Sequence, residues 1–553
     1  MTNITWRRSA ATAAALLTAG IMLAGCTGKP HETNGTTDGL DLPTAAPPAT
    51  TDVDLVTWNL SGGEPATLDP VKAFSGSDLQ VSANLCESLL TMTDTGDIQP
   101  GLASSIDQPS PTEYVVHLRD GVTFTDGTPM TSDDVVYSLN RIRDPEAGSY
   151  WGYFAERVES VTAVDASTVK IDMSQPDAVF YRMLVTPVGQ VIQKAFAEEA
   201  GETYGTPTGG VMCTGPYTLA NWTPGDSITL EANPNWWKIG QQPLRTKSAK
   251  FTFLTEDATI TSALVNGDID GSMDIASTSL PQLLNAPNGE MYAGPSTRQF
   301  VIIPTDLSAD SASPLADPKI RQALAKSIDY QGLLTTVWAG LSEPLRTIVP
   351  PGAWGYSKEI YQTAYDEFSD PARDIEGAKA LLKEAGNPNP KIVLAVPADF
   401  PQYVTIGESI QSNAKDAGFD IELRALPGAE SNALFSDPDA RAKVDAFISD
   451  YFSDIPDPTE LYMQLGVPDG ASNFNSYDNP EVAALLEEAR GTADDDARAE
   501  LTVKAQATIT EDLVWIPVSY PLQSVFLNNR LGGMTAAFPA ALYTPWLAFL
   551  GGR

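Results

Sequence analysis

Alternating apolar and polar residues predict several strands along the chain. Val56, Trp58 and Leu60 alternate with polar neighbours and predict a strand that ends at the turn formed by Gly62 and Gly63. A second strand is predicted over Tyr114–Leu118, where the turn dipeptide Asp120-Gly121 follows closely. A late strand is predicted over Val514–Val518.

Capping residues predict where the helices begin. Thr131, with Asp134 three residues later, resembles a capping box for a helix through Leu139. Asp374 is expected to cap a helix that ends at Ala385, with Gly386 just beyond it. Further helix starts are predicted at Asp78 (for a helix carrying Leu79, Leu85 and Leu89), at Asp317 before Pro318, and at Asp478 or Asn479 before Pro480.

The second half of the chain contains one clear βαβ unit. A strand over Ile392–Val396 precedes a helix from about Tyr403 to Ala417, which ends at Gly418, and Ile421 and Leu423 form the next strand. Parallel strands joined by a helix imply a right-handed crossover. The sequence therefore predicts an α/β lobe with a mixed sheet.

The N-terminus predicts export. Arg7 and Arg8 precede an apolar stretch from about Ala10 to Leu23, which is too short for a stable membrane span and is typical of a signal peptide over residues 1–25. Leu23–Cys26 resembles the bacterial lipobox, in which the cysteine thiol receives a diacylglycerol. We therefore expect lipidation of Cys26 and anchoring to the outer face of the cell membrane.

Residues 26–52 are expected to form a flexible tether behind that anchor. They lack an apolar period and are rich in Gly, Pro, Thr and Ala. A chain of this composition would let a folded body pivot above a membrane.

Cysteine usage then leaves one pair. If Cys26 carries lipid, Cys86 and Cys213 remain in an oxidising compartment, and we predict that they form a disulfide. The alternative is two buried thiols.

Length and charge limit the architecture and the partners. A chain of 553 residues is too long for a single core, so two large lobes are expected. Acidic residues outnumber basic ones by 71 to 34, which disfavours nucleic acid and anionic membrane surfaces as partners.

The residues needed for common enzyme chemistry are scarce. The chain has two histidines, His31 in the tether and His117 in a predicted strand, where a hydrogen-bonded structural role is expected. It contains no HExxH, GxSxG or paired CxxC motif and no Walker-type glycine loop. Hydrolysis by paired carboxylates stays open, but no spacing singles out a pair. We expect no enzyme, no metal and no cofactor.

Several ordered segments resemble one family. Glu64–Pro70 followed by Leu85–Leu90 resembles the N-terminal signature of the family 5 extracellular solute-binding proteins, the dipeptide- and oligopeptide-binding group. Leu118–Val135 resembles the central motif of that family without gaps. Further similar segments are Thr214–Tyr217, Val265–Asp270, Ile320–Asp329, Ala378–Gly386 and Ser476–Val482.

The resemblance implies a type II periplasmic-binding-protein fold of class α/β, with two hinged lobes, mixed sheets and an extra small domain. It places domain Ia at 53–92, 213–300 and 518–553, domain Ib at 93–212, and domain II at 301–517. A monomer is expected.

The resemblance also implies a transport function. A di- or oligopeptide would be captured between the lobes and delivered to the permease subunits of an ABC importer. The same transport of a nickel complex, a sugar or haem is the alternative within the fold. A secreted hydrolase or adhesin is the alternative outside transport.

A carboxylate is implied for the peptide ammonium group. The family pattern Trp-x-Ala-Asp-Tyr-x-Asp/Glu-Pro aligns with Tyr451–Pro458, which makes Asp454 the ammonium partner and places Phe452 and Ser453 beside it. A shifted alignment would select Asp450 instead. The alternative for Asp454 is a turn cap before Pro456.

The opposite wall of the site is implied by two other segments. The turn at Glu64, Pro65 and Ala66 matches a segment whose backbone contacts peptide in the family. Trp354 and Tyr356 are candidates for lining a pocket, with a purely structural core role as the alternative.

Overall fold

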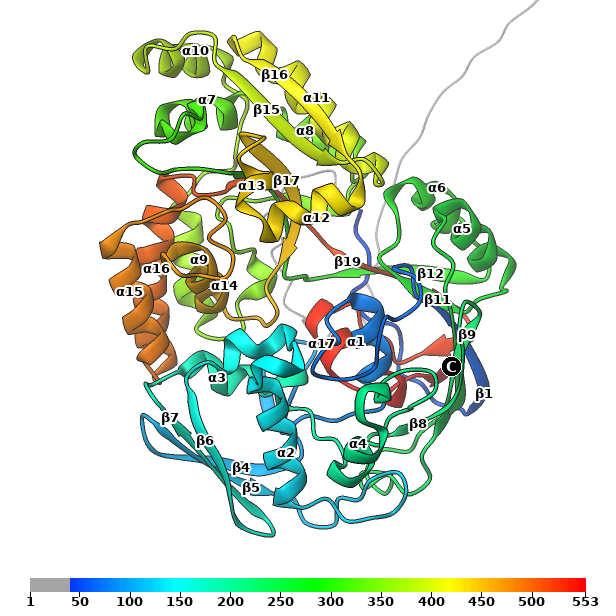
Figure 1. Cartoon of the computed structure of the whole chain (residues 1–553). Coiled ribbons are helices and arrows are strands. Elements are labelled where there is room, and N and C mark those ends of the chain that lie inside the picture. The colour runs from blue at the N-terminus through cyan, green and yellow to red at the C-terminus, as the bar shows by residue number, and fades with distance from the viewer. Residues whose placement is uncertain (1–39) are drawn as a thin grey trace, which may run out of the picture. The chain divides into compact units, whose positions relative to one another are not determined.

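Three large β-sheets organise residues 40–553, which are the residues that the computed structural model describes, apart from the side chains of residues 538–540 (Figure 1). The predicted signal peptide and Cys26 lie outside this range. The prediction of an α/β protein with mixed sheets is confirmed.

A seven-stranded mixed sheet forms the first lobe. Its strand order is β12-β19-β11-β1-β10-β9-β8, with β1 parallel to β10 and β11 and the other pairs antiparallel. The strands are β1 (Val53–Asn59), β8 (Tyr217–Thr223), β9 (Ser227–Ala232), β10 (Thr246–Thr252), β11 (Gly271–Met273), β12 (Gly289–Gly294) and β19 (Gln523–Asn528).

A six-stranded mixed sheet forms the second lobe, in the order β14-β18-β13-β17-β15-β16. Along β13, Phe300 and Ile302 face one hydrophobic core while Val301 and Ile303 face another, so both faces of the sheet are covered. The predicted βαβ unit is confirmed, since β15 and β16 are parallel. The strands are β13 (Arg298–Pro304), β14 (Ser342–Pro344), β15 (Lys391–Pro397), β16 (Asp420–Leu426), β17 (Ala446–Phe452) and β18 (Ile516–Pro521).

A four-stranded antiparallel sheet, β4-β5-β7-β6, forms a smaller third body, with α2 (Ser132–Arg143) packed against it (Figure 1). His117 lies on β5, and its Nε2 is 3.1 Å from Asp107 Oδ2, which is a structural contact. The strands are β4 (Ala103–Ser110), β5 (Glu113–Leu118), β6 (Val158–Asp165) and β7 (Thr168–Met173).

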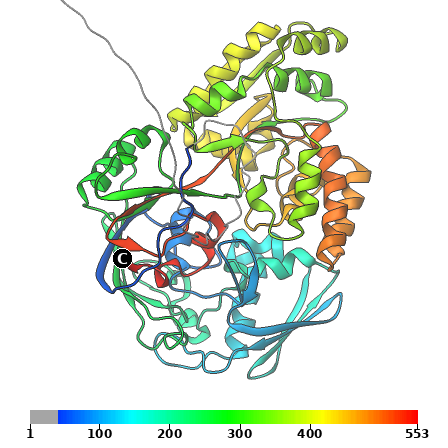
Figure 2. The ribbon, with the colours of Figure 1, turned by 180° about the vertical axis from the view of Figure 1, so that it is seen from behind.

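The chain crosses between the two large sheets twice. Residues 295–297 connect β12 to β13, and Leu522 connects β18 to β19. The two crossings touch, because Ser296 Oγ donates a hydrogen bond of 2.6 Å to the carbonyl of Pro521. Figure 2 shows the ribbon of the lobes from behind. Two adjacent crossings of this kind form a hinge.

The expected domain boundaries differ locally from the sheets. β18 runs to Pro521, so the boundary predicted at 517/518 falls inside this strand. The boundary at 92/93 falls within the hairpin of β2 (Leu90–Met92) and β3 (Ile98–Pro100).

Most helix caps lie where the sequence predicts. Thr131 and Asp134 form the capping box of α2, and Asp317, Asp374 and Asn479 are the N-caps of α7, α10 and α15. The helices are α3 (Ala178–Met183), α4 (Lys194–Ala200), α5 (Asp257–Asn266), α6 (Leu280–Leu283), α7 (Pro318–Ser327), α8 (Tyr330–Thr336), α9 (Lys358–Asp366), α10 (Ile375–Glu384), α11 (Pro401–Ala417), α12 (Gly428–Ser436), α13 (Pro438–Arg441), α14 (Pro458–Gly466), α15 (Pro480–Gly491), α16 (Asp495–Glu511) and α17 (Phe538–Tyr543).

One predicted helix is wrong in extent. α1 covers only Gly76–Ser82, so Leu85 and Leu89 lie beyond it. Its N-cap is Ser75, and Asp78 is instead the third helical residue of a capping box. The carboxylate of Asp78 also accepts a hydrogen bond of 2.9 Å from the N–H of Ala66. These bonds fix the preceding loop onto the helix.

The last part of the predicted tether is packed rather than flexible. The N–H of Ala46 donates to the carbonyl of Met534, and the N–H groups of Thr50 and Thr51 both donate to Gly552. Residues 40–52 therefore belong to the seven-stranded lobe, which corrects the prediction of a tether to residue 52. None of the helices between residues 40 and 553 has both the length and the apolarity needed to cross a membrane.

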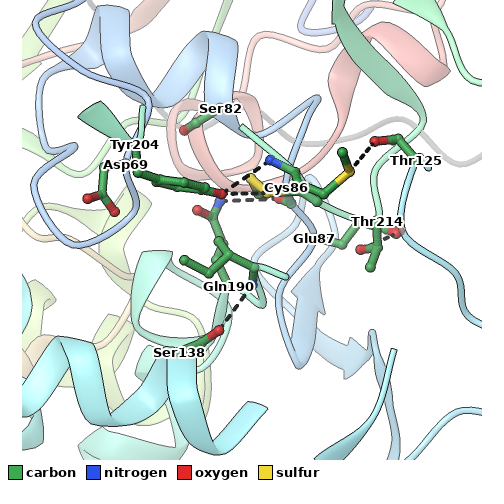
Figure 3. Close-up of a disulfide and its surroundings, with 12 residues drawn as sticks. Asp69, Ser82, Cys86, Glu87, Thr125, Ser138, Gln190, Tyr204 and Thr214 are labelled. Carbon is green, nitrogen blue, oxygen red and sulfur yellow. Dashed lines mark hydrogen bonds between the residues drawn. A yellow bond between two sulfur atoms is a disulfide. The ribbon is translucent and has the colours of Figure 1, made fainter. Parts of the chain in front are cut away.

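Cys86 and Cys213 form a disulfide, as the cysteine count predicts (Figure 3). Gln190 Nε2 donates to the Cys86 carbonyl at 3.2 Å, and the neighbouring Glu87 carboxylate accepts hydrogen bonds from Thr214 Oγ1 and Trp237 Nε1. The bond thus joins the loop after α1 to the strand-rich segment that begins near residue 213.

Removing this cross-link should destabilise the protein through its unfolded state. The half-cystines are 127 residues apart in sequence. We expect the double variant Cys86→Ser/Cys213→Ser to lose about 5 kcal/mol of unfolding free energy in the loop-entropy model. Urea unfolding monitored by tryptophan fluorescence measures this loss. A variant with the same urea midpoint as the wild type would contradict the expectation.

Candidate functional site

Asp454 is a buried carboxylate that follows β17. Asp454 is 5% exposed. Among residues 40–553, no group forms a hydrogen bond or an ion pair with its carboxylate. Burial raises the pKa of Asp454 to about 7. A buried charge without a partner is costly, so this position favours a cation supplied from outside the chain.

Glu460 lies next to Asp454. It sits in the first turn of α14 and is 1% exposed. Its Oε1 accepts a hydrogen bond from Gln464 Nε2, and its Oε2 has no hydrogen-bond partner in the described chain. Burial and the charges of Asp454 and Asp457 raise the pKa of Glu460 well above its usual range. Two carboxylates therefore share one buried region.

Four tyrosines lie close enough to these two carboxylates for the acids' charges to raise their pKa values. The charge of Asp454, followed by burial, raises the pKa of Tyr150 well above its ordinary value. Burial and then the charge of Asp454 do the same to Tyr543. We call Asp454, Glu460, Tyr150, Tyr153, Tyr451 and Tyr543 the acidic–aromatic cluster.

The members of the cluster come from both sides of the hinge. Tyr150 precedes β6, next to the four-stranded sheet, and stacks on Phe74 with ring centroids 4.9 Å apart. Tyr543 ends α17, which packs on α1 and β2. Tyr451 and Asp454 belong to the six-stranded lobe. The cluster is therefore a meeting point of the lobes.

Asp457, the third acid of this segment, is compensated within the protein. It is fully buried and lies 3.4 Å from Arg182 Nε and 3.9 Å from Arg498 Nη2. Its Oδ1 accepts hydrogen bonds from Tyr356 Oη and from the N–H of Thr459. Asp457 is thus a structural ion-pair partner and helix cap.

Comparisons with known proteins identify the family of this chain. Residues 97–473 match the model of the middle region of the bacterial extracellular solute-binding proteins, family 5. This chain belongs to that family. It also has the type II fold of periplasmic binding proteins, in which two hinged lobes carry mixed sheets.

Similar proteins cover nearly the same length. The periplasmic oligopeptide-binding protein OppA of Escherichia coli K12 is 27% identical over 87% of this chain and 89% of its own. Heme-binding protein A of Haemophilus influenzae is 28% identical over 85% and 87%. The crystal structure of the ABC transporter substrate-binding protein CtaP of Listeria monocytogenes superposes with a TM-score of 0.78 at 23% identity, over 91% and 100%.

Asp450, the alternative ammonium partner, is already paired in this family member. It forms an ion pair with Arg298, which also contacts Asp274 Oδ1 at 2.8 Å. Since β13 begins at Arg298 and β11 precedes Asp274, this bridge spans the hinge. Asp450 thus has a cationic partner within the chain, and the choice between Asp454 and Asp450 as the ammonium partner stays a prediction.

The neighbours of Asp454 in sequence have structural contacts. Tyr451 Oη hydrogen-bonds with Ser472 Oγ, and its ring contacts Trp515 edge-on. Phe452 is half-buried and packs against the core of the small domain. Ser453 is fully buried, and its carbonyl accepts a hydrogen bond of 2.8 Å from Thr297 Oγ1 in the hinge.

The Glu64–Ala66 turn is held within the seven-stranded lobe. The Glu64 carboxylate accepts hydrogen bonds from Trp222 Nε1 at 2.7 Å and from the N–H of Gly225 at 2.9 Å. Pro65 is buried, and the N–H of Ala66 donates to Asp78. These groups therefore have partners within the lobe, and a role of this turn in ligand binding stays a prediction.

Trp354 has a mainly structural position. It is 6% exposed and packs with Tyr361 and Tyr365. It also borders a cavity of about 300 Å³ that reaches Pro456, two residues after Asp454. Tyr356, the other candidate, is buried and hydrogen-bonds to Asp457, Thr459 and Tyr361.

Arginine-centred ion pairs join the small domain to α15. Arg490 lies 2.7 Å from Asp177 Oδ2 and 2.8 Å from Glu156 Oε1. Arg157 Nη2 contacts both oxygens of Glu487. Because Arg490 and Asp177 are nearly inaccessible, this contact is formed only when the two bodies lie together.

Sequence reasoning missed five of the residues that meet here. Phe74, Tyr150 and Tyr153 carry no distinctive pattern, and Tyr543 lies in an apolar C-terminal stretch. Glu460 had an available signal, because it follows the Asp457-Pro458 pair of the family pattern. In the part of the chain that the structure describes, no group of three or more His, Cys, Asp or Glu side chains is placed to hold a metal ion.

The raised pKa of Asp454 predicts a pH dependence of ligand-free stability. An acid whose pKa is higher in the folded state destabilises that state as pH rises from its unfolded to its folded pKa. We expect Asp454→Asn to gain thermal stability over the wild type progressively between about pH 4 and about pH 8. Calorimetric scans across this range measure it. Asp469→Asn, at an exposed acid, should show no such trend, and a flat difference for Asp454→Asn would contradict the burial effect.

The two interdomain pairs should differ in energy because they differ in burial. Arg490→Met leaves the buried Asp177 Oδ2 without its cation and should cost about 3–5 kcal/mol of unfolding free energy. Glu487→Gln breaks a pair whose acid is 50% exposed and should cost less than about 1 kcal/mol. Urea titrations of the two variants measure these losses of unfolding free energy. Equal losses would show that burial does not decide how much each ion pair contributes to stability.

Proposed function

We propose that this family 5 protein captures a peptide with a free N-terminus between its lobes and delivers it to the permease subunits of an ABC importer. The observation that carries the proposal is Asp454, a buried carboxylate with no partner in the described chain. The similarity to OppA, a periplasmic oligopeptide-binding protein, supports a peptide as the ligand.

The physical chemistry of capture follows from that carboxylate. An α-ammonium group beside Asp454 would form an ion pair in a region of low dielectric, where the attraction is stronger than in water. The pair would also remove the cost of leaving Asp454 charged and alone. Binding energy would thus come largely from the peptide terminus, which every peptide shares.

Lobe closure would be coupled to capture. The hinge at residues 295–297 and 522 allows rotation, and Asp454 meets Tyr150 only when the lobes lie together. The Arg490–Asp177 pair forms at the same junction and would stabilise the closed form that a permease receives. No step breaks a bond in the solute.

We further propose a lipid anchor at Cys26, which would hold the protein at the outer face of the membrane near its permease. The support is the Leu23–Cys26 lipobox after a signal-peptide pattern. Cys26 lies outside the described residues.

The ammonium role of Asp454 predicts both the size and the pH dependence of binding. Asp454→Asn should weaken the binding of a peptide with a free amino group by roughly 2–4 kcal/mol, because the ammonium group loses its buried partner. Wild-type affinity should rise from about pH 5.5 to about pH 7.5, as Asp454 with its pKa of about 7 loses its proton. Calorimetry at both pH values measures each effect.

An N-acetylated form of the same peptide is the control for this experiment, since it has no ammonium group to pair. Equal wild-type binding of the acetylated peptide, or unchanged affinity in Asp454→Asn, would remove Asp454 from the site. Native mass spectrometry of the purified protein tests the alternative solutes. If haem, a sugar or a nickel complex co-purifies with the protein, that compound and not a peptide is the transported solute.

A further inference from the structure

The acidic–aromatic cluster contains two buried carboxyl groups that no cation of the described chain balances. Asp457 is matched by Arg182 and Arg498, and Asp450 is matched by Arg298. Asp454 and Glu460 have no cationic partner among residues 40–553. Two neighbouring buried carboxylates therefore remain uncompensated.

Unpartnered polar atoms around this pair indicate a place for a ligand. Glu460 Oε2 and Tyr543 Oη are both buried and have no hydrogen-bond partner in the described chain. The phenol of Tyr543 lies within the electrostatic field of both carboxylates, although it belongs to the C-terminal segment of the chain. Buried polar groups are normally satisfied in folded proteins, so these atoms are available to donors on a bound molecule.

A hydrogen-bond chain fixes Glu460 in place. Gln464 Nε2 donates to Glu460 Oε1, while Gln464 Oε1 accepts from Ser472 Oγ at 2.9 Å. Ser472 in turn hydrogen-bonds with Tyr451 Oη. This network orients the Glu460 carboxylate and leaves its second oxygen for another partner.

We propose that the cluster selects a ligand end with two positive charges, namely a peptide whose first residue is lysine, arginine or ornithine. Asp454 pairs with the α-ammonium group, and Glu460 pairs with the cationic side chain of the same residue. The rings of Tyr150, Tyr153 and Tyr543 supply electron-rich faces for the cations. This assignment rests on the proposed peptide function and names the class of peptide.

The competing arrangement makes a different prediction. If Glu460 keeps its proton in the complex, it contributes no charge, and one ammonium group balances the cluster. A neutral first side chain would then bind as well as a basic one, and Glu460→Gln would leave the preference unaltered.

The test offers defined peptide pools to the purified protein after unfolding and refolding to remove bound solute. The pools are Xaa-Ala, Xaa-Ala-Ala and Xaa-Ala-Ala-Ala, where Xaa is lysine, arginine, glutamine or norleucine. Native mass spectrometry identifies the bound peptides, and calorimetry at pH 7.5 then compares the lysine and norleucine forms of the best length. We expect the lysine form to bind at least about tenfold more tightly.

Glu460→Gln tests the residue itself. The amide keeps the side-chain length and can still accept from Gln464, so we expect the lysine-to-norleucine affinity ratio to fall to about one. Thermal stability of the ligand-free variant should increase, because a buried unpaired carboxylate is removed, and this increase shows that the variant is folded. Glu500→Gln, at an exposed acid on α16, is the matched control and should keep the wild-type ratio.

The outcomes separate this inference from the proposed function. Peptides that bind without a basic preference, or a ratio unaffected by Glu460→Gln, overturn the inference and leave peptide capture standing. The compound 1,4-diaminobutane is included as a non-peptide probe. If it binds and no peptide binds, peptide capture is overturned, but the preference for a ligand with two positive charges stands. Binding of none of these probes overturns both.

Discussion

The cost of burying unpaired negative charge governs this structure. Asp454 and Glu460 are removed from water without a cation to balance them, although Asp457, three residues from each, is matched by two arginines. A protein that needed these acids only for stability would gain from replacing them. The burial of these two acids fits the proposal that the most stable state of the protein is a complex with a positively charged ligand.

The scaffold explains how such a region can open and close. Two short crossings connect the large sheets, and a hydrogen bond between Ser296 and Pro521 holds them together as one hinge. Around the junction, the pairs centred on Arg298 and Arg490 bridge separate parts of the fold. The same junction therefore carries both the unpartnered acids and the ion pairs that join the parts of the fold.

Sequence reasoning located most elements because they depend on local chemistry. The caps at Thr131, Asp317 and Asp374 and the βαβ unit lie where their patterns predict. α1 is shorter than predicted because Asp78 acts inside the capping box of Ser75, which a lone acid in the sequence does not reveal.

The candidate site was harder to predict, because its residues meet only through tertiary structure. The family pattern selects Asp454 as a candidate, but only the fold shows that Asp450 pairs with Arg298 and that Tyr150 and Tyr543 lie near Asp454. The packing of residues 40–52 beside Gly552 has a further consequence. Residues 40–52 and the C-terminal Arg553 both belong to the seven-stranded lobe, so a force applied at either end of the described chain acts on that lobe and leaves the six-stranded lobe free to rotate.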